Sequence, residues 1–223
     1  MLMPSTARRL HGERGTTLTE VLVASMLTVM IAAVFLTLFS AFSRNVQVEQ
    51  QRAEALRDIR PVIAQMLVEL RQAVDVDNDG AIIASLDSSW GGLDVVFHSD
   101  RRDDMAGPEK YHYYIANCSG GLCDLMHETT PADAGSGPNW TYVIGPSITR
   151  VLVTNVVASG NPLFEGISWA TGSEVVTTSC DATARCVFEV VKIDLRIDPD
   201  PNNATLPEVQ ILEAVRLRNG QRT

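Results

Sequence analysis

The chain has 223 residues, of which 45% are hydrophobic, and its formal net charge is −9. This length accommodates one globular domain with an appendage. The acidic balance excludes a large basic face, so direct nucleic-acid binding is not expected.

The N-terminal region predicts a membrane span. Residues 1–15 carry three arginines against Glu13, and residues 21–43 form an uncharged run of 23 positions. As a helix this run is roughly 35 Å long, which is enough to cross a hydrocarbon core of about 30 Å. A cleaved secretory signal has a shorter apolar stretch of about 7–15 residues, so we expect this span to stay attached to the protein.

The distribution of charge predicts the orientation of that span. Residues 75–223 hold 10 basic and 21 acidic side chains. A short basic segment stays on the cytoplasmic side, while the long region after the span is exported. The sequence therefore predicts a single-pass protein of the cytoplasmic (inner) membrane with an extracytoplasmic C-terminal domain.

Residues 18–74 are predicted to form one long helix. Its first part is apolar all round, whereas beyond residue 44 apolar residues recur at helical i, i+3, i+4 spacing and leave one apolar stripe. Such a stripe needs a packed domain against it. Pro61 lies inside the pattern and is expected to kink or locally unwind the helix, because it removes one backbone donor.

After Asp75 the pattern changes to short β-like runs separated by turn residues. The predicted strands are 81–86, 93–98, 110–116, 122–126, 148–157, 186–197 and 208–217. Segments 99–109 and 128–140 are rich in turn-forming residues and are predicted to be exposed loops. The fold class is therefore α+β, with a long membrane-spanning helical spine followed by an antiparallel β-sheet domain that packs on the distal stripe of the spine.

An acidic residue stands inside the apolar run. A carboxylate in hydrocarbon costs a few kcal/mol, yet Glu20 occurs five residues after Gly15 in the stretch Gly15-Thr16-Thr17-Leu18-Thr19-Glu20. This stretch resembles the class III signal of type IV prepilins and type II secretion pseudopilins. A simpler interpretation is that Glu20 is favoured by the helix macrodipole and reaches towards the membrane interface.

The resemblance implies a specific assembly mechanism. In that family a prepilin peptidase cuts after the glycine, here at the Gly15–Thr16 bond, and N-methylates the new terminus, here Thr16. The glutamate of one subunit then neutralises the N-terminal amine of its neighbour, a role that falls to Glu20. Partners of the chain would be the peptidase, other pilin or pseudopilin subunits and the inner membrane.

Two further stretches narrow the resemblance. Residues 111–128 and 213–223 resemble a strand–turn–strand unit and the closing strand of PilW/PulJ-type minor pilins. The pilin-like division is then a cytoplasmic leader at 1–15, a transmembrane half-helix at 16–43, an amphipathic half-helix at 44–74 and a β-rich extracytoplasmic domain at 75–223. The alternative is a single-pass anchored adhesin or receptor that does not polymerise.

Four cysteines occur as two close pairs, Cys118/Cys123 and Cys180/Cys186. An exported domain meets oxidising conditions, so two disulfides are expected. Four cysteines allow three connectivities, and we predict the local pairing. A zinc site of Cys118 and Cys123 with His112 or His127 is the alternative.

A second candidate metal site follows the helix. Asp75, Asp77 and Asp79 alternate before Gly80, as in the first half of a calcium loop, although position twelve is Leu86 rather than an acid. Calcium is the only cofactor that the sequence indicates, and the alternative is an acidic turn that ends the helix. No hydrolase, zinc-protease or phosphate-loop motif occurs in the chain, so we expect a structural protein rather than an enzyme.

Overall fold

The computed structural model describes residues 17–76, 82–87, 93–100, 107–136, 139–142, 146–158, 162–170, 173–180, 186–201 and 206–217. The chain divides into two compact units, Met1–Val48 and Glu49–Thr223. Each unit is described by itself.

One helix, α1, covers Leu18–Arg71 and contributes to both units. It ends three residues before the predicted boundary, because Ala73–Val74 form a short strand, β1, that pairs with Ser99 and His98. The helix is not interrupted at Pro61, so the predicted local unwinding is wrong. The carbonyl of Arg57 loses its helical donor at this point, but Arg57 and Arg60 are exposed, and water can replace the missing donor there.

In the second unit, α1 packs on the sheet through one stripe. Ile59, Ile63, Met66 and Leu70 are buried, and their spacing of three or four residues places them on one face of the helix. They join the hydrophobic core with strand residues such as Phe97. The predicted amphipathic pattern is thus confirmed for this part of α1.

The sheet is large and entirely antiparallel. Its path is β1-β3-β4-β5-β8-β11-β9-β10, with β2 paired to β3 and β12 paired to β11. The strands are β2 (Ile83–Asp87), β3 (Asp94–Ser99), β4 (Glu109–Ser119), β5 (Leu122–Thr130), β8 (Ile148–Val157), β9 (Phe164–Ala170), β10 (Ser173–Thr177), β11 (Val190–Ile197) and β12 (Val209–Arg216). A separate pair consists of β6 (Ala134–Ser136) and β7 (Asn139–Thr141).

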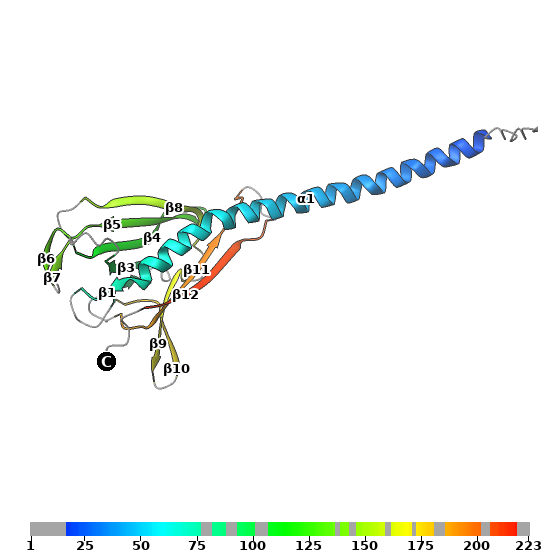
Figure 1. Cartoon of the computed structure of the whole chain (residues 1–223). Coiled ribbons are helices and arrows are strands. Elements are labelled where there is room, and N and C mark those ends of the chain that lie inside the picture. The colour runs from blue at the N-terminus through cyan, green and yellow to red at the C-terminus, as the bar shows by residue number, and fades with distance from the viewer. Residues whose placement is uncertain are drawn as a thin grey trace, which may run out of the picture. The chain divides into compact units, whose positions relative to one another are not determined.

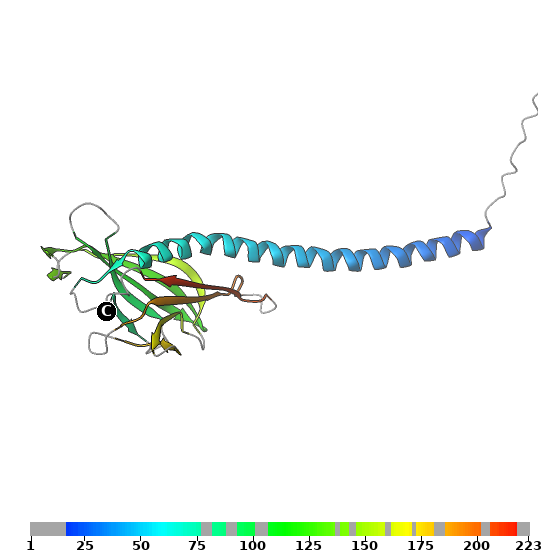
Figure 2. The same cartoon turned by 60° about the horizontal axis from the view of Figure 1, so that its bottom comes forward.

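The cyan half of α1 crosses the sheet where strands β8 and β11 diverge (Figure 1). These two strands pair at a single position, Ile197 with Val156. In the view of Figure 1 the green strands β3, β4, β5 and β8 form one group, and β11 and β12 emerge beyond the helix. Figure 2 shows the sheet lying on one side of α1. This divergence creates the groove discussed below.

A long helix with a large antiparallel sheet matches the predicted α+β class. Five strands were not predicted: β1, β6, β7, β9 and β10. In β9 the obstacle is Gly166, which weakens the strand pattern. The Phe188 ring occupies the space above this glycine, and a Cβ atom there would lie 2.4 Å from Phe188 Cδ1. The glycine is therefore needed for the close approach of the ring.

The loop prediction for 128–140 is also wrong in part, because β5 continues to Thr130 and β6 begins at Ala134. In β11 buried and partly exposed side chains alternate. Val191, Ile193, Leu195 and Ile197 are buried, so Val190 lies on the opposite, partly exposed face.

Candidate functional site

The N-terminus of α1 is capped by a capping box. The backbone N–H of Thr17 donates to Glu20 Oε2 at 3.0 Å, and the N–H of Glu20 lies 3.3 Å from Thr17 Oγ1. These reciprocal bonds satisfy two backbone donors that the first helical turn would otherwise leave unpaired. Sequence reasoning missed this arrangement, although the spacing of Thr17 and Glu20 is the usual capping-box signature. Gly15 and Thr16, the residues of the expected cleavage site, lie outside the described residues.

The first part of α1 exposes an apolar surface on all sides. From Leu18 to Phe42 every side chain is exposed, and large aliphatic and aromatic residues make up most of this surface. The hydroxyl groups within it are not left unpaired. Ser25, Thr28, Thr37 and Ser40 each donate to a carbonyl one turn back, at 2.7 to 2.9 Å. The helix is thus long and apolar enough to cross a membrane, with its polar groups satisfied internally.

A buried polar cluster joins the last turns of α1 to the sheet. Glu69 is fully buried and accepts hydrogen bonds from Tyr113 Oη and, at 2.7 Å, from Gln65 Nε2. His127 Nε2 lies 3.3 Å from Glu69 Oε2. On the other side of the imidazole, Arg150 Nε donates to His127 Nδ1 at 3.2 Å. The cluster therefore links α1, β4, β5 and β8.

The charge state of Glu69 is set by these neighbours. Burial pushes the pKa of its carboxyl group up, but the polar contacts from His127, Tyr113 and Gln65 outweigh burial, and the pKa is lowered from 4.5. Burial, together with the Glu69 charge, raises the pKa of the Tyr113 phenol. Glu69 is therefore ionised and Tyr113 is protonated, as their hydrogen bond requires.

Little in the sequence indicates this cluster. Glu69 lies beside the apolar stripe of α1, three residues after Met66. An acid at such a position indicates that its carboxylate has a polar partner in the core. Both His112 and His127 have polar partners in the folded domain. A cavity of about 480 Å³ adjoins the cluster and is lined by Glu69, Glu109, Tyr111, His127 and Arg150 among others. The role that this geometry supports is to hold the helix on the sheet.

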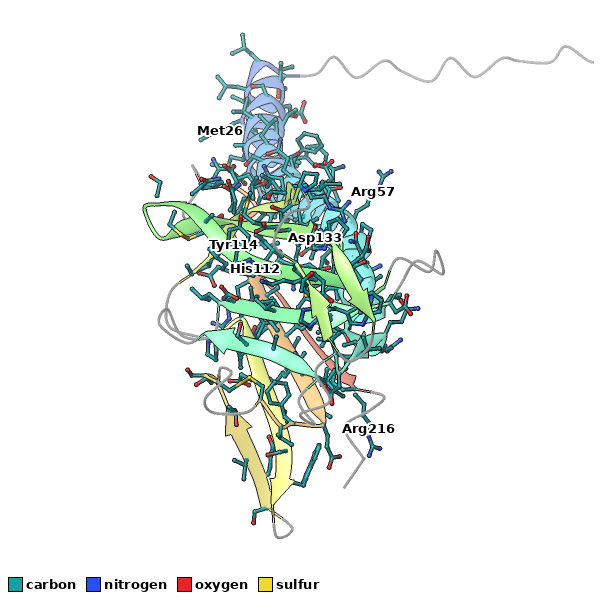
Figure 3. The ribbon with its side chains drawn as sticks, turned by 90° about the vertical axis from the view of Figure 1, so that its left-hand side faces the viewer. Met26, Arg57, His112, Tyr114, Asp133 and Arg216 are labelled. Carbon is teal, nitrogen blue, oxygen red and sulfur yellow. A yellow bond between two sulfur atoms is a disulfide. The ribbon has the colours of Figure 1, made fainter. Side chains whose placement is uncertain are left out.

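A second histidine bridges strands on the other face of β4. His112 Nε2 lies 2.9 Å from Asp94 Oδ2, and its Nδ1 lies 3.5 Å from Glu128 Oε2. The ring stacks on Tyr114 at 4.4 Å, and Figure 3 shows these two side chains next to each other. The two carboxylates contact different ring nitrogens, so the arrangement is a cross-strand link between β3, β4 and β5.

The four cysteines form the two local disulfides that were predicted. Cys118 is bonded to Cys123 and Cys180 to Cys186. The first disulfide closes the β4–β5 turn, where Asn117, Gly120 and Gly121 have positive φ. The zinc alternative is wrong, because both sulfurs of the Cys118/Cys123 pair are oxidised and His112 and His127 are bonded elsewhere.

Only the first of the three predicted calcium ligands lies among the described residues. Asp75 directly follows β1, whereas Asp77 and Asp79 lie outside the described residues. Within the described part of the chain no group of three acidic, histidine or cysteine side chains is arranged to hold a metal ion. The proposed loop of Asp75, Asp77 and Asp79 stays a prediction.

His98 gives the domain a testable pH dependence. Burial, helped by the nearby Lys110 charge, lowers the pKa of His98 from 6.5 to about 4, and the ring packs on Tyr142 at 4.7 Å. On acidification, His98 is protonated at a higher pH in the unfolded chain than in the folded domain. The contribution of neutral His98 to the free energy of unfolding is therefore fully present above pH 6.5 and falls as the pH drops towards 4. At pH 5 the loss is at most about 2 kcal/mol.

We expect His98→Phe, which retains an aromatic ring but cannot titrate, to show a smaller loss of unfolding free energy between pH 7.5 and pH 5 than the wild type. Urea unfolding of the full chain in detergent at both pH values measures this difference. An equal pH dependence in both proteins would contradict the assignment to His98.

Comparisons with protein-family models, with curated proteins and with solved structures find no match for this chain. The function must therefore be argued from the residues and geometry described above.

Proposed function

We propose that this protein is a minor pilin or pseudopilin, a structural subunit that assembles into, or primes, a type IV pilus-like or type II secretion filament. The observation that carries the proposal is the start of α1. A helix whose surface is apolar on every side begins three residues after Gly15. Glu20 is the first charged residue of this helix, and the next charged residue is Arg44.

The apolar surface of α1 needs a cover, because so large an exposed apolar area is unfavourable in water. Before assembly the lipid bilayer can provide it. After assembly the same surface can pack against the equivalent helices of other subunits. The acidic domain that follows would then lie outside the membrane and outside the helical core.

Processing would supply a partner for Glu20. Hydrolysis of the Gly15–Thr16 bond leaves Gly15 as a carboxylate and exposes the α-ammonium of Thr16. The absence of a side chain on Gly15 suits a narrow protease cleft. An unpaired charge in a low-dielectric environment is strongly unfavourable, whereas an ion pair recovers much of that cost. The Glu20 carboxylate of one subunit and the Thr16 amine of a neighbour would fix the axial register of otherwise featureless apolar helices.

The N-terminus of the protein isolated from membranes tests the proposal. We expect intact-mass and N-terminal peptide measurements to show a chain that begins at Thr16, with or without one methyl group. Gly15→Ala is the matched variant and should accumulate with its leader attached. A native chain that begins at Met1 would contradict the proposal and favour the anchored adhesin or receptor.

A further inference from the structure

A groove lies between α1 and the two diverging strands β8 and β11. Its volume is about 450 Å³. Apolar side chains, among them Ile59, Leu152 and Ile197, line its walls. Along β8, residues 148–154 have no strand partner on the groove side among the described residues. The Asp198 N–H donates to the Asn155 carbonyl at 3.0 Å. The groove is therefore an open feature of the second unit.

The charged residues that line the groove are all acidic. Glu54 and Asp58 line it from α1, and Asp198 lines it from the end of β11, whereas no lysine or arginine contributes to the lining. Glu54 and Asp58 are exposed and, within the described part of the chain, have no ion pair or side-chain hydrogen bond. The groove thus combines apolar walls with a negative rim.

The acidic pair is unfavourable in an isolated subunit. Glu54 and Asp58 are four residues apart on α1, and like charges at this spacing destabilise a helix by a few tenths of a kcal/mol. Opposite charge brought in by a partner would reverse this repulsion.

A complementary basic surface lies on the same helix. Arg57 and Arg60 are three residues apart, are both exposed, and also lack an ion-pair partner among the described residues. Figure 3 shows Arg57 pointing away from the sheet. Glu54 and Arg57 have a spacing that permits an intrahelical pair, but no such pair forms. We call Arg57 and Arg60 the arginine row.

We propose that the acidic groove receives the arginine row of a second copy of this chain. Arginine suits the groove because its aliphatic stem can lie along apolar walls while its guanidinium group meets the carboxylates at the rim. The inference rests on the proposed function, which brings the helices of neighbouring subunits together. It adds the extracytoplasmic surface through which they recognise each other.

The contact is directional. The groove and the arginine row are different surfaces of one subunit, so each copy offers a groove to one neighbour and an arginine row to another. Such a heterologous contact does not close on itself as a symmetric dimer does, and it can propagate along a filament.

Cysteine cross-linking between two tagged full-length copies in membranes tests the contact. One copy carries Thr154→Cys in the groove, and the other carries Ala53→Cys, which is exposed and four residues before Arg57. All four native cysteines are in disulfides, so background reaction is low. Thr149→Cys, exposed on the same strand but outside the groove lining, replaces Thr154→Cys in the control.

We expect the groove pair to cross-link about tenfold more than the control pair. Reversing the groove charges (Glu54→Lys with Asp58→Lys) in the Thr154→Cys copy should abolish this excess. Reversing the arginine row (Arg57→Glu with Arg60→Glu) in the Ala53→Cys copy should then restore it. All these positions are exposed, and thermal melts of the variants verify that the domain is folded.

The inference would be overturned if the groove and control pairs cross-linked equally, or if neither charge reversal changed the cross-linking yield. The proposed function is tested separately, because cleavage at Gly15 does not depend on the groove. A chain that begins at Thr16 but fails the cross-linking test would leave the proposed function standing and remove only this contact.

Discussion

Replacement of Glu69 by alanine is expected to destabilise the β-sheet domain by about 3–5 kcal/mol, because removing one partner of a buried charged cluster leaves the others unpaired. The Tyr113 hydroxyl and the His127 imidazole would lose their contacts with Glu69 in a buried site. For a domain of this size the melting temperature should fall by roughly 10 °C. Circular dichroism melts of the full chain in detergent measure this change.

Two variants identify the cause of the effect. Glu69→Gln keeps an acceptor for Tyr113 but removes the charge, and it should cost less than alanine, about 1–3 kcal/mol. Glu49→Ala removes an exposed glutamate from the same helix and should leave the melting temperature nearly unchanged. If Glu69→Ala melted within the error of Glu49→Ala, the cluster would have no role in attaching α1 to the sheet.

The same cluster predicts an acid-sensitive component of stability. Since the pKa of Glu69 is lowered from 4.5, its contribution is fully present above pH 4.5 and is lost as the pH falls through the folded-state pKa. This window overlaps the His98 window only between pH 4.5 and pH 4, so the change from pH 7.5 to pH 5 reports His98 and the change below pH 4 reports Glu69. Glu69→Gln should lack the component below pH 4.5.

Removal of the Glu20 charge is expected to give the largest loss of assembly. Glu20→Ala should still be cleaved after Gly15 but should enter filaments at least about tenfold less than the wild type, since an unpaired amine in the apolar core costs a few kcal/mol. Quantitative immunoblots of sheared filaments and of membranes measure incorporation. They also report cleavage through the size of the chain.

The capping box makes Glu20→Gln the decisive comparison. Glutamine at this position can still accept from the Thr17 N–H, but it carries no charge. If Glu20 acts by pairing with an amine, glutamine and alanine should fail alike. If glutamine assembles normally, the acid serves only to cap α1, and the ion-pair hypothesis is wrong.

Features formed by residues close in the sequence could be predicted, whereas features formed by distant residues could not. The apolar period of α1, from Ile59 to Leu70, identified the buried face of the helix because neighbouring residues on a helix face follow a fixed spacing. The two disulfides were also predictable, since their cysteines are five and six residues apart. In contrast, Ala73–Val74 were assigned to the helix, because their partners in β3 are about 25 residues away and leave no local signal.

The cluster around Glu69 could not be predicted for the same reason. Tyr113 is 44 residues from Glu69, and His127 and Arg150 come from two further strands. Each residue by itself has an ordinary sequence context. Strand β9 was missed because Gly166 is explained only by the Phe188 ring that packs on it.

The sequence by itself determined the apolar length of the N-terminal helix, the place of Glu20 within it and the acidity of residues 75–223. These properties depend on composition and on contacts within a few residues. Only the tertiary structure decided that Glu69 is buried, that β8 and β11 diverge, and that Glu54, Asp58 and Asp198 meet at one groove. Such features arise because folding brings distant segments together. Burial between these segments then sets the free-energy cost of leaving a polar group there without a partner.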